Sequence, residues 1–135
     1  MVAFSELRFI SVSIELDANS VYAFTCNPGN LPKWAAGLGL GIERSGDHWE
    51  VQTAQGSVNL RFTPNNPYGV LDHTVTLTDG TEVYVPMRVI PHGTGSEVTL
   101  GLFRQPEMDD DAFERDAALM KSDLLALKAL LDRTR

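Results

Sequence analysis

The chain has 135 residues, of which 43% are hydrophobic and 21% are charged, a composition that is ordinary for one globular domain. Its formal net charge of −7 disfavours a nucleic-acid partner or an anionic membrane surface, because both need clustered Lys and Arg. No apolar run reaches the roughly 20 residues of a membrane span, and the one cysteine, Cys26, excludes an internal disulfide. The length and composition predict one domain over residues 1–135. The first residues also lack a signal-peptide pattern, so we expect a cytoplasmic location.

The first predicted elements are a strand and two short helices. Residues 7–16 alternate between apolar and polar side chains, as a half-buried strand does. A short helix is expected up to residue 25, where the sequence Asn-Pro-Gly-Asn at 27–30 breaks it. A second short helix over residues 31–36 is expected to end at Gly37.

Turn-forming sequences divide the next part of the chain into short strands that are expected to pair antiparallel. The predicted strands cover residues 42–44, 48–53, 57–63, 70–78, 82–90 and 97–104. With the first segment they make about seven strands. Pro86 lies within one of them, and because proline cannot donate to the hydrogen-bond ladder, it indicates an edge position or a bulge.

Residues 109–135 are predicted to form one long amphipathic helix. Its apolar positions recur every three or four residues: Phe113, Ala117, Met120, Leu124, Leu127 and Leu131. Asp111 and Glu114 have the spacing of a capping box at its start. A run of strands followed by one long helix predicts an α+β fold, in which the helix packs on one face of a curved antiparallel sheet. A cavity can remain between the two.

Two segments carry a resemblance to a known superfamily. Residues 17–24 (DANSVYAF) and 27–34 (NPGNLPKW) resemble the first helix and the following segment of START-like or SRPBCC proteins. That superfamily includes the polyketide cyclase/dehydrase-like and birch-pollen-allergen-like proteins. The predicted element order matches it over nearly the whole chain, so the resemblance implies a helix-grip fold with a ligand cavity beneath the long helix. The superfamily has no universal catalytic set, so the resemblance implies no catalytic residue.

His73 is the first candidate site residue. The alternation in residues 70–77 places it with Leu71, Val75 and Leu77 on the apolar face, which should face the interior. An imidazole there could bind a ligand or exchange a proton near pH 7. The alternative is a core histidine that pairs with a backbone carbonyl or with a neighbour across the sheet. Val75 is expected to be part of the same cavity wall.

Four other residues are candidate ligand contacts. The resemblance places Trp34 near the cavity mouth, where it would cover a ligand or anchor the short helices. Trp49 is expected on the core side by alternation. Tyr84 and Arg88 flank Pro86, so a bulge could turn either one inward. An inward Arg88 would favour a carboxylate or phenolate ligand, whereas an outward one would be a solvated charge.

We expect no metal and no cofactor. His48, His73 and His92 fall on different predicted elements, and no pair has ligand spacing. The expected function is binding of a small hydrophobic molecule that is lipid-like, polyketide-like or aromatic. One alternative is a cyclase- or dehydratase-type enzyme with His73 as general acid/base. Another is a structural or regulatory protein whose cavity has closed, and a homodimer is left open.

Overall fold

The computed structural model describes residues 4–35, 41–53 and 56–132. Its elements in chain order are β1 (Leu7–Ile14), α1 (Ala18–Thr25), the 3-10 turn η1 (Pro28–Asn30), α2 (Leu31–Trp34), β2 (Ile42–Ser45), β3 (His48–Thr53), β4 (Gly56–Phe62), β5 (His73–Thr76), β6 (Glu82–Val85), β7 (Met87–His92), β8 (Gly95–Phe103) and α3 (Asp110–Leu131). The predicted end of the second helix at Gly37 lies outside the described residues. The fold is α+β, as the sequence predicts.

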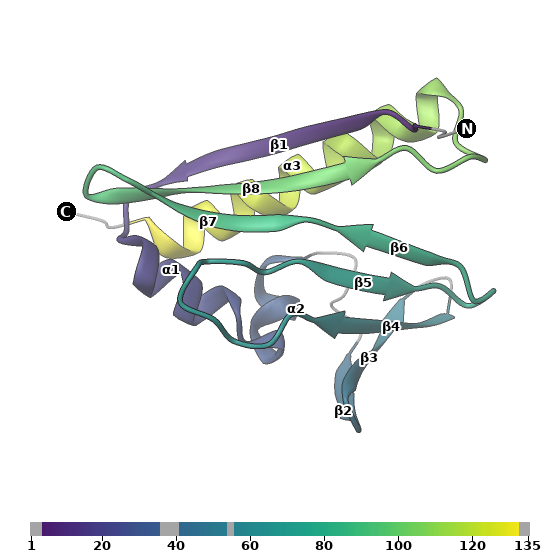
Figure 1. Cartoon of the computed structure of the whole chain (residues 1–135), viewed down its shortest axis with the longest axis horizontal. Coiled ribbons are helices and arrows are strands. Elements are labelled where there is room, and N and C mark those ends of the chain that lie inside the picture. Colours follow the sequence, from purple (N-terminus) through teal and green to yellow (C-terminus); the bar gives the residue numbers. More distant parts are fainter. Residues whose placement is uncertain (1–3, 36–40, 54–55, 133–135) are drawn as a thin grey trace.

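The strands form two antiparallel sheets. Their strand orders are β1-β8-β7 and β2-β3-β4-β5-β6. Figure 1 shows α3 running along one face of β1, β8 and β7, while β2 and β3 turn away from the rest of the second sheet. The two sheets meet where β6 leads directly into β7, so together they make one strongly curved surface around the core.

The long helix α3 packs through the predicted apolar stripe. Phe113, Ala117, Leu124 and Leu127 are buried, and Met120 is partly buried against the same core. None of the described helices is both long enough and apolar enough to cross a membrane.

The start of α3 differs from the prediction. The N-cap is Asp109, whose carboxylate accepts a hydrogen bond of 2.8 Å from the backbone N–H of Ala112. The capping box expected from Asp111 and Glu114 is therefore wrong, because the helix begins one residue before Asp111. Glu114 instead forms a two-pronged ion pair with Arg8 on β1, with both N–O distances 2.8 Å.

Pro86 separates two strands where the sequence predicts one. Residues 82–90 divide into β6 and β7, which belong to different sheets, so the described residues contain eight strands instead of about seven. Side-chain alternation continues across the proline, because Val85 and Met87 are both buried. Pro86 thus marks a change of sheet, and no bulge resets the alternation. Its carbonyl accepts a 2.8 Å hydrogen bond from Gly101, where an added Cβ would lie 2.9 Å from the proline ring.

The predicted strand 70–78 begins only at His73 for a related reason. The preceding residues pair with β7 in the other sheet: Val89 N donates to Gly69 O at 2.9 Å and Leu71 N donates to Met87 O at 2.8 Å. Gly69 has φ +73°, and a Cβ there would lie 2.3 Å from the Val89 carbonyl oxygen, so only glycine fits this crossing. The chain passes from one sheet to the other at the next polar residue, Asp72.

Candidate ligand-binding site

A cavity of about 300 Å³ lies between the concave side of the sheets and the helices α2 and α3. This volume is at the lower end of the range for small-molecule pockets. Most lining side chains are aliphatic or aromatic and come from β4, β5, β6 and α2, with Met120 of α3 on the opposite side. The polar side chains in the lining are Thr25, His73 and Asp123, together with the indole of Trp34.

Antiparallel pairing aligns the wall of the cavity. Directly opposed residues on neighbouring strands share one face of a sheet. Leu60 of β4 is opposite Val75 of β5, and Phe62 is opposite His73, which in turn is opposite Val85 of β6. All five side chains line the cavity. Alternation within β4 and β5 therefore produces one continuous wall in which His73 is the polar member.

His73 faces the interior, as the alternation predicts, although Leu77 does not. Leu77 follows the end of β5 and is 38% exposed. Nδ1 of His73 lies 3.0 Å from the Leu71 carbonyl oxygen, and the ring packs against Phe62 with the ring centroids 5.2 Å apart. Burial lowers the pKa of His73, against smaller opposing effects of the Leu71 carbonyl and the nearby Asp72 charge. The imidazole is therefore neutral at pH 7.

The other polar residues of the lining come from the helices. Thr25 at the end of α1 donates a 2.7 Å hydrogen bond to the Val21 carbonyl, so its hydroxyl hydrogen is already used. Asp123 places a carboxyl group from α3 in the lining. Trp34 is 7% exposed, and its buried Nε1 has no hydrogen-bond partner in the described part of the chain. Trp34 packs in the core and lines the cavity at once, so both roles considered for it fit this position.

Trp49 lies outside this cavity, which corrects the expectation that it forms part of the wall. Its backbone is opposite Leu60, so it is on the core-facing side of the sheet. However, β3 turns away beyond β4 (Figure 1). The indole consequently lines a separate, more open hollow together with Cys26, Phe62 and Thr63.

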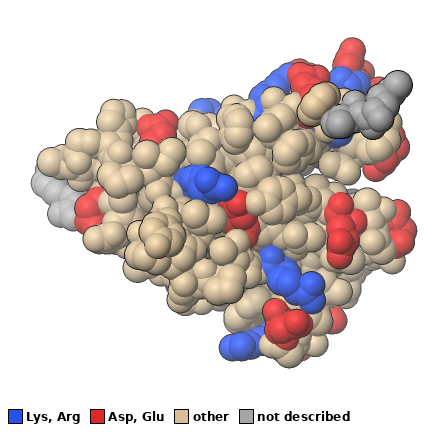
Figure 2. Space-filling model, viewed as in Figure 1, with Lys and Arg blue, Asp and Glu red and all other residues tan. Residues whose placement is uncertain are grey.

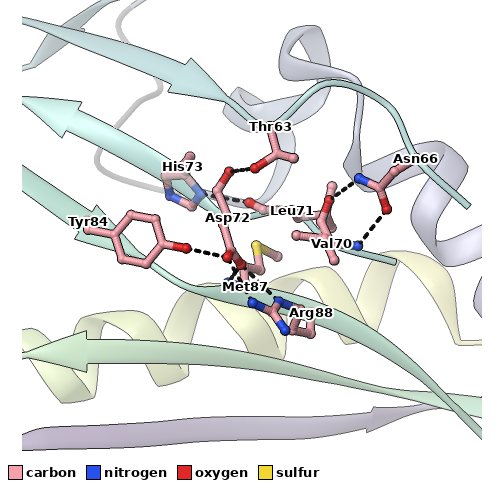
Figure 3. Close-up of polar contacts among 9 residues, drawn as sticks. All are labelled: Thr63, Asn66, Val70, Leu71, Asp72, His73, Tyr84, Met87 and Arg88. Atoms are coloured by element: carbon pink, nitrogen blue, oxygen red, sulfur yellow. Dashed lines mark hydrogen bonds and ion pairs between the residues drawn. The ribbon is translucent and has the colours of Figure 1, made fainter. Parts of the chain in front are cut away.

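Tyr84 and Arg88 are also outside the cavity. Because alternation is unbroken at Pro86, their side chains lie on the opposite side of the sheet from Val85 and Met87, and they are about half exposed. Both contact the carboxylate of Asp72 (Figure 3). Arg88 donates to it at 3.0 and 2.9 Å and Tyr84 donates through its hydroxyl group. An Arg88 that binds a ligand carboxylate in the cavity is therefore excluded.

Asp72 is the residue that the sequence reasoning missed. Its carboxylate also accepts a 2.8 Å hydrogen bond from the backbone N–H of Met87, the first residue after the proline interruption. The hydrogen bond from Arg88 is the main cause that lowers the pKa of Asp72 to about 2. A usable signal existed: with Leu71 and His73 inward, Asp72 must face outward, as Tyr84 and Arg88 do under unbroken alternation.

A larger hollow of about 610 Å³ lies near the end of α3 and the β7–β8 turn. Its lining includes Lys128 and His92, but both have partners. Lys128 lies 3.0 Å from Asp132 and donates to the Ser13 carbonyl at 2.7 Å, and His92 lies 3.4 Å from Glu97. Across residues 4–35, 41–53 and 56–132, no group of three or more His, Cys, Asp or Glu side chains could hold a metal ion. The apolar cavity is thus the better candidate site.

Comparison with known proteins identifies the fold. No protein-family model and no curated protein matches the sequence. Among solved structures, Ara h 8.0201 matches with a TM-score of 0.70 and 12% identity, covering 93% of this chain and 96% of its own. The Aha1 dimer from Colwellia psychrerythraea matches with a TM-score of 0.74 and 16% identity, covering 94% and 96%. DynU16, a putative protein in the dynemicin biosynthetic locus, matches with a TM-score of 0.70 and 15% identity, covering 91% of this chain but 46% of DynU16.

These likenesses show the fold of the chain: a curved antiparallel sheet with a long C-terminal helix, the helix-grip arrangement. The helix-grip fold that the resemblance implies is thereby confirmed. At such low identity the likeness does not extend to a ligand or a reaction.

Proposed function

We propose that this protein binds a small hydrophobic molecule, lipid-like, polyketide-like or aromatic, in the cavity between the curved sheets and α3. The observation that carries the proposal is about 300 Å³ of space with a largely apolar lining inside the core. Protein interiors are normally packed as densely as organic crystals, and a void of this size forfeits packing energy. A ligand that fills it would recover those contacts.

A cyclase- or dehydratase-type enzyme is the second candidate. It is favoured by the neutral, inward-facing His73, which could accept a proton from a substrate. General acid/base catalysis also needs a second group that orients the base or holds the developing charge. Nδ1 of His73 is bound to a backbone carbonyl instead of a carboxylate, and the Thr25 hydroxyl is bound to Val21. Binding alone requires only the shape and the apolar wall, so we favour it. A structural role with a closed cavity is less well supported, because about 300 Å³ of space lies between the sheets and the helices.

The proposal can be tested with N-phenyl-1-naphthylamine, an uncharged dye that fluoresces in apolar surroundings. We expect binding at about one site per chain. Val75→Trp should weaken binding strongly, because the indole would occupy the cavity. Thr76→Trp is the matched control, since it places the same side chain on the opposite face of β5. Equal dye binding by wild type and a folded Val75→Trp variant would contradict the proposal.

We also propose that the chain can form a homodimer, as the Colwellia protein does in solution. The sheet face opposite α3 exposes apolar side chains, with Phe9 59% and Leu7 39% exposed, and few charged side chains cover its middle (Figure 2). Light scattering after gel filtration should give the mass of two chains, and a mass of one chain would refute the dimer.

We also propose that the protein is located in the cytoplasm, as the sequence predicts. Fractionation of source cells, followed by detection with an antibody, would test it.

A further inference from the structure

We infer that the cavity selects an uncharged ligand that carries a hydroxyl group, and that this hydroxyl donates a hydrogen bond to Nε2 of His73. The inference rests on the proposed binding function and specifies the class of ligand. It follows from the tautomer of His73, from the ionisable groups around the cavity, and from the cavity volume.

The backbone fixes the tautomer. A carbonyl oxygen can only accept a hydrogen bond, so the 3.0 Å contact between Nδ1 and the Leu71 oxygen requires the hydrogen to be on Nδ1. In a neutral imidazole, Nε2 then carries a lone pair and can only accept. The backbone of Leu71 is also tied to β7, because its N–H donates to Met87 O at 2.8 Å.

Nε2 is left available for a ligand. Figure 3 shows one hydrogen bond to the His73 ring, through Nδ1. Within the described residues Nε2 has no partner, while the ring lines the cavity and packs on Phe62. Burial, which lowers the pKa of the imidazole, keeps the neutral form in place. A ligand hydroxyl in the cavity could donate to this lone pair, so the hydroxyl and the imidazole would satisfy each other.

The ionisable groups disfavour an anionic ligand. Of the described residues that line the cavity, Asp123 and His73 are the ionisable ones, and none is Lys or Arg. Arg88 is on the other side of the sheet, bound to Asp72. A carboxylate or phosphate would lose its hydration without gaining a counter-charge, which is costly. The ligand group that meets His73 should therefore be a phenol or alcohol.

The volume suggests suitable probes. An engineered cavity of roughly 150 Å³ accepts benzene, so about 300 Å³ should accommodate two fused rings. Naphthalene, 2-naphthol and 2-naphthoate share this framework and differ only in the polar group. At pH 7 a phenol is uncharged, because its pKa is about 10, whereas a carboxylate is ionised.

The experiment measures the dissociation constants of the three probes for wild type and for His73→Leu. Wild type should bind naphthalene and 2-naphthol but not 2-naphthoate. In His73→Leu the affinity for 2-naphthol should fall roughly 5- to 150-fold, the effect of leaving a buried hydroxyl without its partner, while naphthalene should bind as before. Val75→Ala is the control, since loss of a purely apolar wall group should change both affinities by the same factor.

The outcomes separate the two proposals. If wild type does not bind naphthalene, the proposed function itself fails. If naphthalene binds but His73→Leu weakens 2-naphthol no more than naphthalene, or if 2-naphthoate binds as tightly as 2-naphthol, the hydroxyl inference is overturned while the binding function stands. If His73→Leu does not fold, the 15N chemical shifts of the wild-type imidazole decide. Nε2 should shift with 2-naphthol and not with naphthalene, and equal shifts would overturn the inference.

Discussion

The carboxylate of Asp72 accepts two hydrogen bonds from the guanidinium of Arg88, with Nε 3.0 Å from Oδ1 and Nη2 2.9 Å from Oδ2. Asp72 lies where the chain crosses between the two sheets, and it also receives the N–H of Met87 just after Pro86. The contact therefore joins the two sheets next to Pro86, where the chain passes from β6 in one sheet to β7 in the other. Although it faces away from the cavity, it stabilises the junction that holds two of the cavity walls together.

Replacement of Asp72 tests this role. Asp72→Ala should lower the free energy of unfolding by about 1–3 kcal/mol, because the buried Met87 N–H loses its acceptor. Tyr84→Phe removes one hydrogen bond at a half-exposed position and should cost less, about 0.5–1.5 kcal/mol. Urea denaturation at pH 7 measures both changes. Equal stability of Asp72→Ala and wild type would show that the cluster does not support the junction.

The stripe on α3 can be tested with two adjacent leucines. Leu124 is 0% exposed and Leu125 is 49% exposed. Leu124→Ala should lower the free energy of unfolding by about 2–5 kcal/mol, as truncation of a buried leucine does. Leu125→Ala makes the same chemical change in the same helix and should cost little, since surface substitutions are usually within about 0.5 kcal/mol. Similar denaturation midpoints for the two variants would contradict the observed packing of α3.

Local patterns were sufficient to predict the elements whose environment is uniform along their length. Phe113, Leu124 and Leu127 recur with the helical period because one face of α3 remains against the core throughout. His73 was placed correctly because Val75 and Leu71 alternate with polar residues over a short stretch. In both cases the sequence neighbours carry the information.

The errors concern pairings between distant residues. Pro86 is compatible with an edge, a bulge or a change of sheet, and only its pairing with Gly101 decides among them. The position of Trp49 depends on how far β3 turns away from β4, which its own alternation does not encode. Asp72 was missed because its partners, Met87 and Arg88, lie 15 and 16 residues further along the chain.

Lys128 gives a third prediction. Its ammonium donates to the Ser13 carbonyl at 2.7 Å, and Lys121 donates to the Ser11 carbonyl at 3.0 Å, so α3 occupies acceptors of the edge strand β1. Exposed edge acceptors are templates for pairing with another chain. In Lys128→Met this protection is lost, so the apparent mass measured by light scattering should rise as the protein concentration increases. Arg115→Met loses the same charge from an exposed site on α3 and should behave like wild type. Identical behaviour of the two variants would argue against protection of the edge by Lys128.

The pH dependence of stability should reveal the neutral state of His73. Burial places its pKa in the folded protein below the value of 6.5 that applies to an exposed histidine. Above pH 6.5 neither state holds this proton, so the stability is independent of it. As the pH falls below 6.5, the unfolded chain is protonated first, and the free energy of unfolding must decrease until the folded pKa is reached.

His73→Leu should remove this decrease. Urea denaturation from pH 7.5 to about 5 should show a smaller decline for the variant than for wild type, whatever its stability at pH 7.5. The carboxyl groups near His73, Asp72 beside it and Asp123 in the cavity lining, are present in both proteins. Loss of the Asp72 interactions belongs to a lower range, because stability from a carboxyl with a pKa of about 2 is lost as the pH falls from 3.8 through 2. Parallel curves for wild type and variant between pH 7.5 and about 5 would mean that His73 is not held neutral by burial, and the acceptor role of Nε2 would lose its electrostatic basis.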